Sequence, residues 1–110
     1  MRSIAEVDEK IENAFMSLPS EDKSAVISHG AAIRLSELNK RAFLAREKVR
    51  SFEEKYAVKL PEIEKTGLPD DAGYEMHEDY IMCSHWSDVI EKTEKQIELL
   101  RPLLEYGVLR

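Results

Sequence analysis

The residues with the greatest chemical potential lie in one short stretch, Leu68-Pro-Asp-Asp-Ala-Gly-Tyr-Glu-Met-His-Glu-Asp-Tyr80. It holds five carboxylates, two tyrosines and one histidine. Such a set could ligate a metal ion, act as an acid–base pair or attract a basic partner. A purely structural interpretation is also open, because carboxylates at the start of a helix complement its dipole.

A metal site would have to come from the polar residues around this stretch. On one helix His77 and His85 lie two turns apart, which is too far to chelate one ion unaided, and Cys83 points nearly opposite to His85. The sequence has no CxxC or HExxH spacing, no phosphate-binding glycine loop and no evident Ser-His-Asp arrangement. We therefore predict no metal, no cofactor and no enzymatic activity. The candidate metal ligands are His77, Glu78, Asp79, Cys83 and His85.

A binding epitope for another protein is the interpretation that we favour. Its acids would pair with basic groups of the partner, and its aromatic side chains would provide buried anchors. Phe43 and Leu44 could extend this surface, since both fall outside the predicted helix seam; burial under the first helix is the equal alternative. The predicted partner-binding residues are Asp70, Asp71, Tyr74, His77, Glu78, Asp79, Tyr80 and Trp86, with Phe43 and Leu44.

Length and composition indicate a single helical domain over residues 1–110. The chain carries 16 basic and 22 acidic side chains, a net charge of −6, and 43% apolar residues, enough for a core. Four glycines and four prolines are too few for a turn-rich β-sandwich. With Cys83 as the only cysteine and no signal-like or membrane-spanning apolar run, we expect a cytoplasmic protein that does not contact membranes.

Two helices are predicted before residue 57. The first, over about 3–18, opens with a Ser3–Glu6 capping box and ends before Pro19. The second, over about 21–56, contains Gly30, which marks a kink or a close crossing or simply weakens the helix. Its apolar residues alternate in steps of three and four, as in a coiled coil, and two central alanines would admit a close neighbour. This seam comprises Leu35, Leu38, Ala42, Ala45, Val49, Phe52 and Tyr56.

A corner over 57–73 and a third helix over about 74–100 complete the prediction. Leu60, Ile63 and Leu68 suggest a short helix or turn folded over the end of a hairpin, and Asp70 and Asp71 are placed to cap the third helix. Pro102 should end or kink that helix and leave a short apolar tail over 102–110. Its predicted stripe comprises Met82, Trp86, Val89 or Ile90, Thr93, Ile97, Leu100 and Leu104. The fold class is thus all-α: a long antiparallel, coiled-coil-like helical hairpin with an additional N-terminal helix.

Charge is distributed unevenly along the chain. Residues 34–50 carry six basic and two acidic side chains, whereas residues 53–98 carry thirteen acids and five bases. The basic segment could contact phosphates, but its charges lie on several helix faces, so a solvated flank is favoured. We do not expect the chain alone to bind nucleic acid. Because its seam is longer than one chain of this size comfortably covers, we expect a homodimer.

Four short segments in the second half of the chain are followed by Trp86: Val49-Arg-Ser-Phe-Glu-Glu-Lys-Tyr56, Leu60-Pro-Glu-Ile-Glu, Gly67-Leu-Pro-Asp-Asp71 and His77-Glu-Asp-Tyr80. Through these segments the middle and end of the chain resemble a loosely defined family of small helical proteins encoded in bacterial and archaeal toxin–antitoxin gene pairs. The resemblance covers about residues 30–90. Two positions depart from the family pattern: members have glycine after the Lys-Tyr pair, where this chain has Ala57, and a tryptophan nearer the His-Glu-Asp motif, where this chain has Cys83 and only later Trp86.

The resemblance implies an antitoxin without catalysis of its own. Such a protein would bind a cognate toxin directly, and the toxin would be an RNA-acting enzyme with a basic groove. An acidic, helix-borne segment suits that groove because it can mimic phosphates. Two alternatives stay open: a generic helical scaffold or adaptor, and a DNA-binding regulator that uses the basic segment 34–50.

Overall fold

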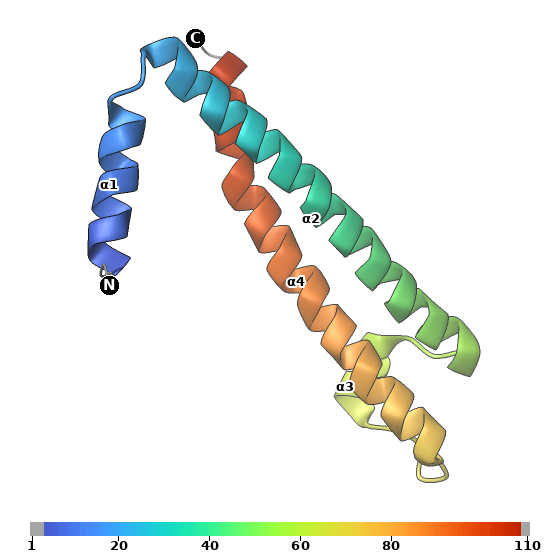
Figure 1. Ribbon diagram of the computed structural model, residues 1–110. Helices are drawn as coiled ribbons and strands as arrows, with labels where there is room; N and C mark the ends of the chain where they lie inside the picture. The colour runs from blue at the N-terminus through green and yellow to red at the C-terminus, as the bar shows by residue number, and fades with distance from the viewer. Residues whose placement is uncertain (1–3, 109–110) are drawn as a thin grey trace. The chain divides into compact units, whose positions relative to one another are not determined.

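The computed structural model describes residues 4–108, with side chains described for residues 4–106. This part of the chain forms helices and no strand, which confirms the all-α prediction. The helices are α1 (Ile4–Met16), α2 (Ser20–Tyr56), α3 (Leu60–Thr66) and α4 (Tyr74–Val108) (Figure 1). The described part of the chain divides into two compact units, one formed by residues 35–98 and the other by residues 4–34 with 99–108.

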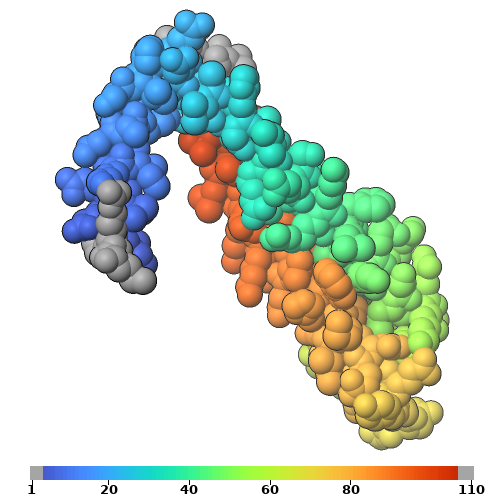
Figure 2. All heavy atoms as spheres, in the orientation of Figure 1, coloured from blue at the N-terminus to red at the C-terminus, as the bar shows by residue number. Residues whose placement is uncertain are grey.

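The unit of residues 35–98 is an antiparallel hairpin of α2 and α4. Arg46 pairs with Glu94, whereas Lys55, later in α2, pairs with Asp79, earlier in α4. The two helices therefore run in opposite directions, and in the space-filling view their side chains meet along the hairpin (Figure 2). This confirms the predicted helical hairpin.

The predicted seam of α2 is the face that the hairpin buries. Leu38, Ala42, Ala45 and Phe52 are each at most 5% exposed, and the remaining seam positions are partly buried. The alternation of three and four residues keeps one stripe of α2 facing α4 over three heptads. Because alanine has no side chain beyond Cβ, the two buried alanines leave room for close approach of the neighbouring helix.

The stripe of α4 differs from the prediction by one residue at its start. Met82 is 53% exposed, and Cys83 is buried in its place. Counting from Cys83, the inward positions follow steps of 3, 4, 3 and 4, and Thr93 and Ile97 are buried as predicted. Met82 and Cys83 are adjacent apolar residues, so the sequence pattern alone could not choose between them. The inward-facing residues of this segment are Cys83, Trp86, Ile90, Thr93 and Ile97.

The end of α2 adopts a backbone conformation that normally requires glycine. Ala57, the first residue after the helix, has φ +52°, and the Val58 N–H donates to the Glu53 carbonyl at 3.1 Å. This is the hydrogen bond of a Schellman motif, whose accompanying apolar contact is also present because Val58 packs against the cluster containing Phe52. An alanine at this position costs energy because its Cβ crowds the following backbone.

A short helix closes the end of the hairpin, as the sequence predicts. The Leu60 N–H, left without a partner inside α3, donates to Glu53 Oε2 at 2.8 Å. Leu60 and Ile63 are buried with Phe52 and Cys83, and Gly67, the residue that follows α3, has φ +83°. Since α4 begins at Tyr74, the N-cap position belongs to Gly73, and the prediction that Asp70 or Asp71 caps this helix is wrong. The residues packed around the four buried side chains are Val49, Tyr56, Val58, Leu68, Met76 and Tyr80.

The other unit contains α1 and the outer ends of α2 and α4. The break at Pro19 is confirmed, but Ser3 of the predicted capping box lies outside the described residues. Nothing lies within 4 Å of a Cβ built on Gly30, so this glycine does not mark a close crossing. The predicted end of α4 is wrong: the helix continues through Pro102 to Val108. Proline removes one helical hydrogen bond, and the leucines, arginine and glutamate around it favour helix.

Candidate partner-binding surface

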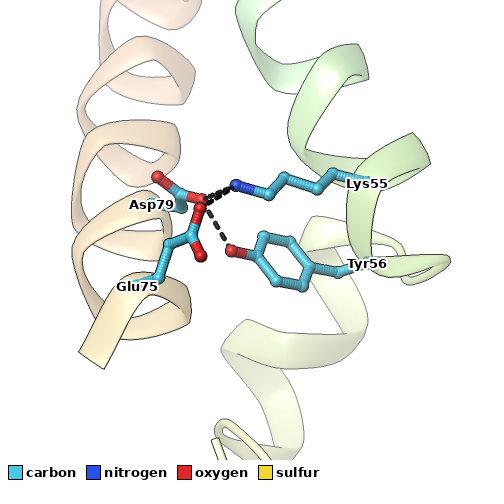
Figure 3. A network of polar contacts seen from close by, with 4 residues as sticks. All are labelled: Lys55, Tyr56, Glu75 and Asp79. Carbon is cyan, nitrogen blue, oxygen red and sulfur yellow. Dashed lines mark hydrogen bonds and ion pairs between the residues drawn. The ribbon is translucent and has the colours of Figure 1, made fainter. Parts of the chain in front are cut away.

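A network of four polar side chains joins the end of α2 to the start of α4 (Figure 3). Lys55 Nζ donates to Glu75 Oε1 at 2.6 Å and to Asp79 Oδ2 at 2.8 Å. The Tyr56 hydroxyl donates to the same Asp79 oxygen at 2.6 Å. Glu75 and Asp79 are one helical turn apart, so both carboxylates face the end of α2.

The network shifts the protonation of its members in a consistent way. The hydrogen bonds from Lys55 and then from Tyr56 lower the pKa of Asp79, because they stabilise its charged form. The pKa of Lys55 is raised, first by Asp79 and then by Glu75. Donation to Asp79 raises the pKa of Tyr56, because the carboxylate disfavours loss of the phenolic proton. Solvent reaches the ion pairs, since the Lys55 side chain is 48% exposed, so each contributes modestly.

Two of the partner-binding residues predicted at the corner, Asp79 and Tyr80, thus have contacts within the hairpin. Asp79 is held by Lys55 and Tyr56, and Tyr80 is partly buried against the core cluster that contains Phe52. Lys55 and Glu75 are not among the residues predicted for this site. Their pairing depends on which residues of α2 and α4 lie opposite each other, which a single sequence does not reveal.

The other predicted residues of the corner are exposed. Tyr74 is 80% exposed, and Asp70, Asp71, His77 and Glu78 are exposed as well. Ile81, which the sequence analysis left out of the site, is 59% exposed. It follows Tyr74 and Glu78 in steps of four and three, and so lies on the same side of α4. We call this set the acidic corner: Asp70, Asp71, Tyr74, His77, Glu78 and Ile81.

The polar residues considered for a metal do not converge. His77 and His85 are exposed, whereas Cys83 is buried in the core cluster. Burial raises the pKa of the Cys83 thiol to about 11, with a smaller contribution from the charges of Glu53 and Glu64. Among the described residues, no three His, Cys, Asp or Glu side chains are placed to hold one metal ion.

Two other predicted partner-binding residues, Leu44 and Trp86, lie away from the acidic corner, along one flank of the hairpin. They border a hollow of about 420 Å³ together with Val89 and Thr93. Trp86 also borders a neighbouring hollow of about 230 Å³, which reaches Met82. We call the two hollows together the flank groove. Phe43 is 65% exposed and lines neither hollow. The charged residues of the groove are Arg41, Lys48, Lys55, Asp79 and Lys92.

Part of the basic charge of residues 34–50 is compensated within the chain. Arg46 Nη2 lies 2.7 Å from Glu94 Oε1, and Arg50 Nη2 lies 2.5 Å from Glu47 Oε2. A second carboxylate, that of Glu54, is 3.9 Å from Arg50. These pairs reduce the positive field that this segment would present to a phosphate backbone.

Comparisons of the chain with models of protein families, with curated proteins and with solved structures found no match. Within residues 4–108, no helix is both long and apolar enough to cross a membrane.

Proposed function

We propose that this protein is a non-enzymatic interaction protein of the antitoxin type that its sequence resembles. It would bind a cognate, RNA-acting toxin through the acidic corner and thereby block the toxin's basic groove. A cytoplasmic location would accompany this function. The observation that carries the proposal is the exposure of three carboxylates beside two uncovered large side chains, Tyr74 and Ile81.

The chemistry of the corner suits a basic partner. Asp70, Asp71 and Glu78 would attract the positive groups of the toxin over several ångströms and increase the association rate. Tyr74 and Ile81 would then lose contact with water, and such anchors supply most of the affinity of protein interfaces. Asp79 has a supporting role here, because its bonds to Lys55 and Tyr56 hold the first turns of α4 against α2.

Co-expression with the neighbouring gene tests the proposal. The parent should restore growth of cells that express the neighbouring protein and should co-purify with it. The double variant Asp71→Lys, Glu78→Lys should fold normally yet lose both properties, because exposed substitutions typically change stability by about 0.5 kcal/mol or less. Its residual binding should also depend less on salt.

A matched control carries the same charge change elsewhere on α4. Asp88 and Glu91 are exposed and lie beyond the acidic corner, so Asp88→Lys, Glu91→Lys should leave growth rescue and co-purification intact. The mechanism is wrong if the corner variant neutralises the toxin as well as the parent does, or if both variants fail equally.

A further inference from the structure

The helix α1 presents an apolar stripe that its own unit does not bury. Ile4 is 81% exposed, Val7 41% and Ile11 62%, and no described residue of α1 is buried. The spacing of three and four residues places these side chains on one side of the helix. A helix of 13 residues is marginally stable in water by itself, so this stripe needs a surface to pack against.

The flank groove offers an apolar surface of matching length. Its floor includes Leu44 and Met82, which are 48% and 53% exposed, with Trp86 and Val89 between the helices. Along α2 the groove extends over residues 41–55, roughly 21 Å at 1.5 Å per residue. The helix α1 has 13 residues and is about 20 Å long.

The charges of the two surfaces are opposite. Residues 4–16 contain four acids and one lysine, and on the helix Asp8 and Glu12 lie along one edge of the apolar stripe. The groove is lined by four basic side chains and one acid, of which Lys48 and Lys92 stand outside the network around Asp79. An acidic amphipathic helix is therefore the kind of partner that the groove fits.

We propose that the flank groove binds α1 of a second copy of this chain. The chain's own α1 cannot lie along it, because the groove begins at Arg41, about 32 Å along α2 from Ser20. Three residues connect α1 to α2. Even when these three residues are fully extended, the far end of α1 reaches only the start of the groove. In a two-fold dimer each chain gives one helix and receives one.

Sedimentation of the purified chain, without any toxin, tests this assembly. The parent should sediment as a dimer at micromolar concentration. Ile11→Asp should raise the dissociation constant at least about tenfold, because it puts a charge into the apolar contact. Asn13 lies on the opposite side of α1, so Asn13→Asp adds the same charge outside the contact and should leave the dimer intact. A monomeric parent, or equal effects of the two variants, would overturn the proposal.

Reversing the charges of both surfaces tests whether α1 of the second copy binds in the flank groove. Lys48→Glu with Lys92→Glu should weaken the dimer, and adding Asp8→Lys with Glu12→Lys in the same chain should restore it. Circular dichroism checks that each variant keeps its helices. Failure of the second pair to restore association places the contact elsewhere and contradicts the proposal.

A disulfide test separates a second copy from the chain's own helix. In a Cys83→Ala background, one preparation carries Ile11→Cys and the other Leu44→Cys. Mixing and mild oxidation should give a cross-linked heterodimer. If a chain carrying both cysteines instead forms the disulfide within itself, at monomer mass, the groove holds its own α1 and the proposal is wrong. None of these experiments involves the toxin, so a result against the dimer does not contradict the antitoxin proposal. A failure to bind the toxin likewise does not contradict the dimer.

Discussion

The carboxylate of Glu53, near the end of α2, accepts the N–H of Leu60, the first residue of α3, at 2.8 Å. The same residue's backbone carbonyl accepts the N–H of Val58 at 3.1 Å. Both bonds close the turn between α2 and α3, and they bring Leu60 into the core cluster at the end of the hairpin. Glu53 therefore contributes to both the end of α2 and the start of α3.

Glu53→Ala should destabilise the protein by about 1 kcal/mol, the usual cost of losing a side-chain cap. Glu53→Gln should cost less, because its amide oxygen can still accept the Leu60 N–H. Urea unfolding followed by circular dichroism measures both. Glu54, one residue further along, has a side chain that is 70% exposed, so Glu54→Ala should change stability little. Equal effects of Glu53→Ala and Glu54→Ala would contradict the capping role.

Ala57→Gly should stabilise the protein by about 0.5–1 kcal/mol, because glycine has no Cβ to crowd the backbone at φ +52°. The opposite substitution is Gly67→Ala, which places a Cβ at φ +83° and ψ 172° and should destabilise the protein by about 1–3 kcal/mol. Nothing lies within 4 Å of that Cβ, so the loss would come from the backbone rather than from a clash. Thermal unfolding of the two variants should shift in opposite directions; a decrease for Ala57→Gly would mean that the turn is misassigned.

The helical hairpin was predictable because its signal is periodic. The α2 seam repeats over three heptads, so an error at one position could not move the stripe, and Leu38, Ala42, Ala45 and Phe52 are all buried. The α4 stripe was misplaced only at Met82, where two apolar neighbours compete for one inward position. Pro102 was overestimated as a helix terminator, since its cost is local and the residues on both sides favour helix.

The candidate site was predictable only in part. The exposed acids of the corner follow from a polar segment at the start of a helix. The network around Asp79 does not, because it depends on α2 and α4 meeting in a particular register. Tyr56 belongs to the predicted seam, and its hydroxyl reaches Asp79 only because the hairpin sets that distance.

The Asp79 network should make stability depend on pH at both ends of the range. Because the pKa of Asp79 is lowered on folding, its contribution is present above its ordinary pKa and is lost as the pH falls from about 5 through the lowered value. The raised pKa of Lys55 acts in the opposite direction: its contribution is present below the ordinary lysine pKa and is lost at higher pH.

Asp79→Asn should therefore flatten the acid limb of the stability profile, measured by urea unfolding between pH 3 and 7, pH values chosen to bracket that transition. Asp71→Asn removes an exposed carboxylate from the same corner and should keep the slope of the parent. An unchanged slope in Asp79→Asn would show that the contacts with Lys55 and Tyr56 do not persist in solution.

The buried thiol reports on opening of the hairpin. Cys83 is 2% exposed, and a pKa of about 11 leaves roughly one thiol in ten thousand ionised at pH 7. A thiol reagent such as Ellman's should therefore react at least about a hundredfold more slowly with the folded protein than in urea, since both access and ionisation must be gained. Glu53→Ala should speed the reaction in two ways: it weakens the turn that places Leu60 against Cys83, and it removes a charge that raises the pKa of the thiol.

An exposed cysteine on the same helix supplies the control for this measurement. His85 is exposed, so His85→Cys in a Cys83→Ala background should react at nearly the same rate with and without urea. If Cys83 of the parent reacts as quickly as this control, the core cluster around Phe52, Leu60 and Ile63 does not protect it. The closed end of the hairpin would then open on the timescale of the reagent, and the acidic corner would lack the rigid support that its proposed role requires.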